Sequence, residues 1–108
     1  MAGRVSRGDL WLYRFARPDK RRPVLVLSRP GALARLRTAV VAPITSTVHG
    51  LPSEVVVGQE VGLKSRSAVN LDHVFTVDQA ELRQWIGQLD ERRMRAVCEA
   101  MEIALGCR

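Results

Sequence analysis

The stretch that decides the fold covers residues 21–47 and contains two apolar runs, each with polar residues at one end. The two runs read Arg21-Arg22-Pro23-Val24-Leu25-Val26-Leu27-Ser28 and Thr38-Ala39-Val40-Val41-Ala42-Pro43-Ile44-Thr45-Ser46-Thr47. Apolar, β-branched runs of this kind are typical of strands covered on both faces. If the two strands are antiparallel neighbours, the start of the first lies beside the end of the second. Arg22 and Thr45 would then be close in space although they are far apart in sequence.

The size and charge of the chain suggest its class of partner. With 108 residues, we expect one domain over residues 1–108. The 17 Lys and Arg exceed the 11 Asp and Glu and give a formal charge of +6. This balance indicates a polyanionic partner, either nucleic acid or an acidic protein, with a basic but unengaged surface as the alternative. The hydrophobic content of 46% excludes a disordered chain.

The sequence contains no signal for a metal, a cofactor or a membrane. Its two cysteines, Cys98 and Cys107, form neither a CxxC motif nor a Cys/His cluster, so we expect no metal and no cofactor. The N-terminus lacks the apolar segment of a signal peptide, and the longest apolar run is far shorter than the ~20 residues that span a bilayer. We therefore expect a cytoplasmic protein without membrane contact.

Four further short segments read as strands, because they are rich in β-branched and aromatic residues. They cover residues 10–15, 54–57, 67–71 and 74–77. The first of them is apolar on both faces, so either a second subunit or the rest of this chain covers its second face. In the strand over 38–44, Pro43 indicates a strand end or an edge, where no ladder donor is needed.

The C-terminal part of the chain predicts helices. Asp78 is a suitable N-cap for a helix over 79–85 that ends at Gly87, and Asp90 is a suitable N-cap for the last helix. The last helix carries an apolar stripe at helical spacing: Met94, Val97, Cys98, Met101 and Leu105. Strands followed by helices predict an α+β fold, a small, curled, mostly antiparallel β-barrel with short helices and a C-terminal amphipathic helix.

Three motifs, in this order, resemble the PemK/MazF family of toxin ribonucleases. They are Arg7-Gly8-Asp9-Leu10-Trp11, Arg22-Pro23-Val24-Leu25-Val26-Leu27-Ser28 and Val41-Ala42-Pro43-Ile44-Thr45-Ser46. The later Ser67-Ala68-Val69-Asn70-Leu71-Asp72 and Thr76-Val77-Asp78 fit the same family. The resemblance covers about residues 7–105, and it is carried by the ordered set of motifs.

The resemblance implies an SH3-like barrel that forms a homodimer. It also implies a sequence-specific, metal-independent endoribonuclease that cuts single-stranded RNA and leaves a 2′,3′-cyclic phosphate and a 5′-hydroxyl. A cognate antitoxin, expected here to be acidic, would hold the enzyme inactive by covering its RNA site. By position in the family motifs, the catalytic residues are Arg22 and Thr45.

Other residues are candidates for RNA binding. Residues 16–22 form a basic, proline-containing loop that could follow a phosphate backbone or be a solvated turn. This loop is shorter than its family counterpart. The candidate RNA-binding residues are Arg17, Lys20, Arg21, Ser46, His49, Asn70 and Asp72. Some family members carry an arginine where Asn70 stands, and Asp72 matches an aspartate implicated in others.

The chemistry of strand scission suits the two central candidates. A guanidinium binds phosphate oxygens in a bidentate manner, so Arg22 can stabilise the charge of the transition state without a metal. The hydroxyl of Thr45 can donate to a phosphate oxygen and orient it. Because arginine is effectively never neutral, the general base is a separate question, and His49 and His73 are the imidazoles available.

Two other classes of function compete with the nuclease. One is a protein-poisoning toxin like the gyrase-directed CcdB family, although this chain ends in Gly106-Cys107-Arg108 and lacks the Trp-Gly-Ile end on which that action depends. The other is an RNA-binding barrel without catalysis, which the basic charge fits equally well. Trp11, Phe75 and Trp85 could stack on bases, but we expect them to be buried in the core or in an interface.

Overall fold

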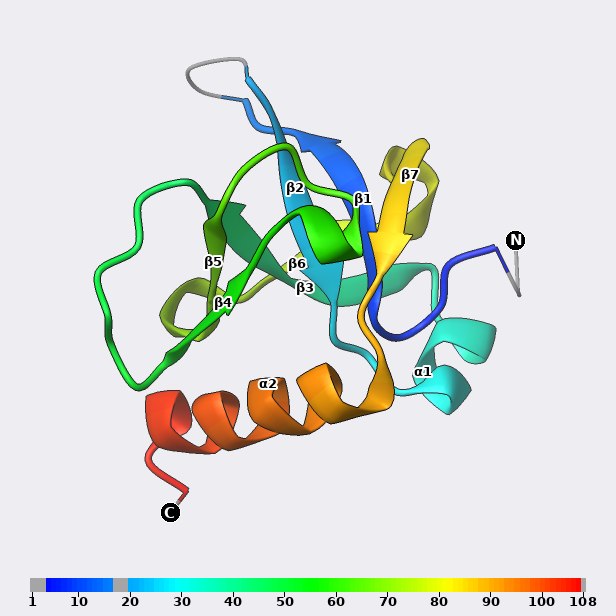
Figure 1. The fold of residues 1–108 in the computed structure, drawn as a ribbon. Helices are drawn as coiled ribbons and strands as arrows, with labels where there is room; N and C mark the ends of the chain where they lie inside the picture. Colours follow the sequence, from blue (N-terminus) through cyan, green and yellow to red (C-terminus); the bar gives the residue numbers. More distant parts are fainter. Residues whose placement is uncertain (1–3, 17–19, 108) are drawn as a thin grey trace.

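The computed structural model describes residues 4–16 and 20–107, which form one curled sheet with a helix beneath it (Figure 1). The strands are β1 Asp9–Arg14, β2 Arg21–Val26, β3 Thr38–Thr45, β4 Glu54–Val57, β5 Ser67–Asn70, β6 Phe75–Asp78 and β7 Gln84–Gln88. The α-helices are α1 Pro30–Arg35 and α2 Glu91–Leu105, and 3₁₀ turns cover Gln59–Val61, Leu71–His73 and Gln79–Glu81. The expected loop over 16–22 is shorter than predicted, because β2 begins at Arg21.

The strand order is β4-β5-β3-β2-β1-β7, with β6 paired to a second part of β3. The strand pairings of the described residues are all antiparallel. Helix α2 lies across one side of the sheet and packs against β4 and the Leu71–His73 turn (Figure 1). This arrangement confirms the predicted α+β barrel with a C-terminal helix.

Strand β3 changes partners along its length, and Pro43 marks the change. On one side, residues up to Val41 pair with β6, while Ile44 and Thr45 pair with β5. Pro43 therefore lies between the two ladders, where its missing N–H removes no hydrogen bond on that side. The expected strand end at Pro43 was wrong, since β3 continues to Thr45. The expectation that this position needs no ladder donor agrees with the pairing.

Strand β2 is buried on both faces, as its apolar run predicted, whereas β3 is only partly so, because Val40 is 38% exposed. Val24, Leu25 and Val26 are each 0% exposed. On one face, Leu25 packs in a cluster that includes Val97 and Ala100 of α2. On the other face, Val24 and Val26 belong to a second cluster, which also contains Val5, Trp11, Leu33, Ala39, Val41, Val77 and Leu82. The chain itself thus covers both faces in the first half of β1, with Leu10 in the first cluster and Trp11 in the second, whereas Leu12 and Tyr13 are half-buried.

Helix α2 begins and ends where the sequence predicted. The Asp90 carboxylate accepts a hydrogen bond from the backbone N–H of Arg93 at 2.8 Å, and Gly106 follows the helix with a φ of 73°. Val97 of the predicted stripe is fully buried, but Leu105 is 62% exposed, so the stripe loses contact with the sheet at the last turn. No helix in the described ranges is long and apolar enough to cross a membrane.

The helix expected over 79–85 was wrong. Only a 3₁₀ turn forms at Gln79–Glu81, and the chain then becomes β7, which pairs with the free edge of β1. The buried side chain of Gln79 donates to the carbonyl oxygens of Leu33, Leu36 and Thr38 at 2.9–3.1 Å. These contacts tie the turn to α1 and β3, so tertiary hydrogen bonds override the local helix signal.

Candidate active-site groove

A groove with a volume of about 830 Å³ opens where the ends of several strands meet. One wall consists of the start of β2 and the end of β3, and β7 contributes Gln84, Trp85 and Ile86. The loop between β4 and β5 forms the opposite wall with Gly62, Leu63, Lys64 and Ser65, and Ser67 at the start of β5 adds to it. The groove therefore joins segments that are far apart in the sequence.

Arg22 and Thr45 both line this groove. Their proximity follows from the register of β2 and β3, in which Val24 pairs with Pro43. Continuing that register by two residues places Arg22 opposite Thr45 on the same face of the strand pair. Arg22 is exposed and Thr45 is half-buried. The predicted proximity of the two residues agrees with this register.

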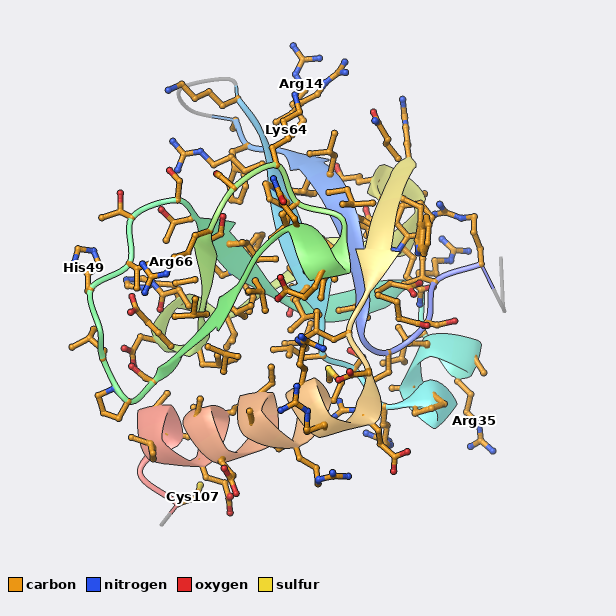
Figure 2. All side chains as sticks on the ribbon, in the orientation of Figure 1. Arg14, Arg35, His49, Lys64, Arg66 and Cys107 are labelled. Atoms are coloured by element: carbon orange, nitrogen blue, oxygen red, sulfur yellow. The ribbon has the colours of Figure 1, made fainter. Side chains whose placement is uncertain are left out.

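The groove is basic. Lys20, Arg21, Arg22 and Lys64 contribute four positive side chains, and none of its described lining residues is acidic. Lys64 projects at the upper end of the molecule in Figure 2, near the β1–β2 hairpin. The electrostatic potentials of neighbouring positive charges add up inside a concave surface, so the groove is suited to a polyanion.

A hydrogen-bonded turn holds Thr45 and the loop that follows it. The Oγ1 atom of Thr45 accepts a hydrogen bond from the N–H of Thr47 at 3.2 Å. A hydroxyl that accepts in this way can still donate its own hydrogen to a ligand. Further along, Oε1 of Glu54 accepts from the N–H groups of His49, Gly50 and Leu51 at 2.9–3.3 Å. Glu54 therefore orders the loop beside the site.

The opposite wall of the groove was not predicted from the sequence. Lys64 and Ser65 belong to a glycine-containing segment between β4 and β5, and Ser67 begins β5. The basic residues of this segment, Lys64 and Arg66, were the available signal. Nothing local in the sequence connects this segment with residues 20–22. The 3₁₀ turn Gln59–Val61 brings it there by packing against β7.

Trp85 also lines the groove, and its side chain is 57% exposed. Burial in the core or in an interface was expected for it; the structure places it outside the core, whereas Trp11 is buried with 5% exposure. The difference arises because Trp85 lies on β7, an edge strand of the sheet. Phe75 is half-buried and packs edge-on against Tyr13.

The structure separates the remaining candidates. Ser46, Lys20 and Arg21 line the groove together with Arg22 and Thr45. His49, Asn70 and Asp72 are not among its lining residues, and Arg17 lies outside the described residues. His49 projects from the loop between β3 and β4, at the left of Figure 2.

Asn70 and Asp72 have structural partners at the far end of β5. The side chain of Asn70 accepts a hydrogen bond from the N–H of Asp72 at 2.9 Å. The Asp72 carboxylate in turn accepts from the hydroxyl of Ser53. His73, the other imidazole, lies in the adjoining 3₁₀ turn and also outside the groove lining. Within the described ranges, no three His, Cys, Asp or Glu side chains cluster in a way that could hold a metal ion.

Comparison with known proteins identifies the family. Residues 6–105 match the family model described as the PemK-like, MazF-like toxin of type II toxin–antitoxin systems. A curated relative, the probable endoribonuclease MazF5 of Mycobacterium tuberculosis, is 48% identical over 99% of this chain and 98% of its own length.

Solved structures agree with this match. The M. tuberculosis toxin MazF-mt6 superimposes with a TM-score of 0.82 at 36% identity, covering 91% of this chain and 96% of that one. A MazE-MazF structure from Deinococcus radiodurans has a TM-score of 0.80 at 25% identity, covering 94% and 96%. The chain therefore belongs to the PemK-like, MazF-like toxin family of type II toxin–antitoxin systems.

Proposed function

We propose that this protein is a metal-independent, sequence-specific endoribonuclease that cleaves single-stranded RNA in the groove described above. The observation that carries the proposal is the pairing of Arg22 and Thr45 across β2 and β3, in a basic groove of a chain from this family. Curated relatives of this chain carry the name endoribonuclease, which favours the nuclease over the protein-poisoning alternative.

Each of the two residues has a defined role in the proposed cleavage. The 2′-oxygen of the ribose loses its proton and attacks the neighbouring phosphorus, and the bond from phosphorus to the 5′-oxygen breaks. Arg22 stabilises the negative charge that builds up on the non-bridging oxygens. Thr45 donates its hydroxyl hydrogen to the phosphate and holds it in line for attack. The 5′-oxygen takes up a proton as it leaves, and the products carry a 2′,3′-cyclic phosphate and a 5′-hydroxyl.

The other lining residues favour an unpaired strand as the substrate. Lys20, Arg21 and Lys64 are placed to contact phosphates, and Ser46 offers a polar contact beside Thr45. The exposed indole of Trp85 offers a flat surface on which a base can stack. A base in a duplex is already stacked and paired, so this combination suits single-stranded RNA.

Proteins are the second class of partner that we propose. The family description includes an antitoxin, and the net charge of +6 favours an acidic antitoxin segment that occupies the basic groove and excludes RNA. A homodimer, as the family resemblance implies, is part of the same proposal. Action on cellular RNA would place the protein in the cytoplasm.

The test is cleavage of a long, weakly structured RNA by purified protein in EDTA, with the new ends mapped. The wild type should produce discrete cuts that end in cyclic phosphate. Arg22→Ala and Thr45→Ala should each lose on the order of 10²–10³ in rate, the usual effect of removing one transition-state donor. Arg35→Ala, which removes a charge from α1 at the opposite end of the molecule (Figure 2), is the matched control and should cleave normally.

Two outcomes would contradict the proposal. One is intact RNA after incubation with folded wild-type protein over a broad set of sequences, which would leave binding without catalysis. The other is full activity of Arg22→Ala, which would show that the Arg22 guanidinium has no role in the reaction. Circular dichroism of each variant excludes unfolding as the cause of lost activity.

A further inference from the structure

A second, smaller cavity of about 370 Å³ adjoins the groove. The two cavities share three lining residues, Leu12, Arg21 and Gln84. Gln84 is the first residue of β7, and Arg21 is the first residue of β2. A strand of RNA that leaves the groove across these two residues therefore reaches the second cavity directly.

Three guanidinium groups from separate elements line this cavity. Arg14 ends β1, Arg21 begins β2, and Arg83 directly precedes β7. Arg14 and Arg21 are direct cross-strand partners in the β1–β2 ladder. This register brings two guanidinium groups to the same edge of the cavity, where one anion can contact both.

The remaining lining residues leave the positive charge dominant. Glu81 is the one acidic residue among the described residues of this lining. Burial, the neighbouring charge of Glu81 and a hydrogen bond to its carboxylate raise the pKa of the Tyr13 phenol. Glu81 is thus engaged by a neutral phenol, and the three guanidinium groups line the cavity with one opposing carboxylate.

We propose that this cavity binds a phosphodiester group of the same RNA strand, one step beyond the nucleotides held in the groove. The proposal rests on the proposed ribonuclease function. Arg83 and Arg14 hold the phosphate, and Arg21, which lines both cavities, bridges it to the groove. A planar guanidinium binds phosphate oxygens in a bidentate manner, so Arg83 contributes to the affinity for RNA. It takes no part in bond cleavage, because the phosphate that it holds lies beyond the one that is cleaved.

The test uses a series of short RNAs around the mapped cut site. Each carries a 2′-deoxy nucleotide at the scissile position, so that it binds without being cut, and the series grows by one nucleotide at either end. The wild type should gain affinity at one step of the series. Arg83→Gln should lose roughly tenfold in affinity for RNAs beyond that step, as expected for one charge-assisted contact, and nothing for shorter ones. For these longer RNAs, the slope of log affinity against log salt concentration should be smaller in magnitude by about 0.7 for Arg83→Gln than for the wild type.

A second, independent test replaces one phosphate of the RNA, the one added where the wild type gains affinity, by a neutral methylphosphonate. This replacement should weaken binding by the wild type at least as much as Arg83→Gln does, and its effect in that variant should be smaller than in the wild type, because the two changes share the Arg83 contact. Arg35→Gln, remote from both cavities, controls for net charge.

Two results would overturn the second phosphate site while leaving the nuclease intact. In one, wild-type protein cleaves RNA, but Arg83→Gln and Arg35→Gln behave alike at every length. In the other, Arg83→Gln weakens every RNA equally, including the shortest, which would make its effect a general one of charge. Failure of the proposed function itself would be distinct, because no RNA would then be cleaved at all.

Discussion

Gly87 and Val61 meet backbone to backbone. A Cβ atom at position 87 would lie 2.0 Å from the carbonyl oxygen of Val61, well inside van der Waals contact. On the other side of this contact, a Cβ at Gly62 would lie 2.6 Å from the carbonyl oxygen of Ile86. The turn that leads into the far wall of the groove is therefore packed directly on β7. The glycine that was expected to end a helix is needed for this close approach.

Replacing Gly87 with alanine should push the wall of the groove away from β7. The added methyl group meets backbone, which cannot rotate aside, so we expect a loss of about 1–3 kcal/mol in the free energy of unfolding and reduced RNA cleavage. Thermal unfolding and cleavage rates measure the two effects. Gly31→Ala is the matched control, because a Cβ at position 31 would meet no atom of the surrounding fold within 4 Å. Equal stability of both variants would contradict the packing argument.

Arg22 and Thr45 should behave as one unit in a double-mutant cycle. Both act on the same phosphate in the proposed reaction, so the rate lost in Arg22→Ala/Thr45→Ala should be far smaller than the product of the two single losses. Single-turnover cleavage at saturating enzyme measures this without interference from binding. Losses that simply multiply would show that the two residues act on separate steps.

Trp85 should contribute to RNA binding more than to the chemical step. Stacking of one base is worth about 1–3 kcal/mol by alanine substitution, so Trp85→Ala should raise KM with little change in kcat, and Trp85→Phe should retain most of the affinity. Fluorescence gives a direct readout, because Trp11 is buried and Trp85 is exposed. RNA should quench the emission of the wild type and leave that of Trp85→Phe unchanged. Unaltered KM in Trp85→Ala would rule out the stacking role.

Asp90 should make the stability of α2 depend on pH in the acid range. The hydrogen bond from the N–H of Arg93 lowers the pKa of the Asp90 carboxyl below its ordinary value. Because the folded state binds the proton less tightly than the unfolded state, Asp90 stabilises the fold above its unfolded pKa of about 4 and loses this contribution as the pH falls through the lower folded value.

The variant Asp90→Asn tests this pH dependence of stability. Asparagine caps helices about as well as aspartate but does not titrate. As the solution is acidified, the Tm of the wild type should therefore fall more than the Tm of Asp90→Asn. Thermal unfolding followed by circular dichroism over this range tests the prediction. Parallel pH profiles for the two proteins would show that the cap contributes no linkage.

The two central strands show how far sequence patterns reach. The apolar runs around Val24 and Val41 predicted strands covered on both faces. The structure confirms this for Val24, Leu25 and Val26 of β2, whereas in β3 it buries Val41 but leaves Val40 38% exposed. The cap at Asp90 and the glycine after α2 were equally local signals, and both were confirmed. The segment 79–85 had a local helix signal as well, but the side-chain hydrogen bonds of Gln79 and the free edge of β1 determined its structure.

The sequence by itself determined the fold class and which strand ends lie side by side, because strand burial and antiparallel pairing depend on the spacing of nearby residues. Arg22 and Thr45 could be placed together in this way. Only the tertiary structure decided the rest of the groove: the wall that carries Lys64, the exposure of Trp85, and the position of Asn70 and Asp72 outside the groove lining. These features depend on how distant segments pack, and the backbone contact between Val61 and Gly87 is not encoded in any local pattern.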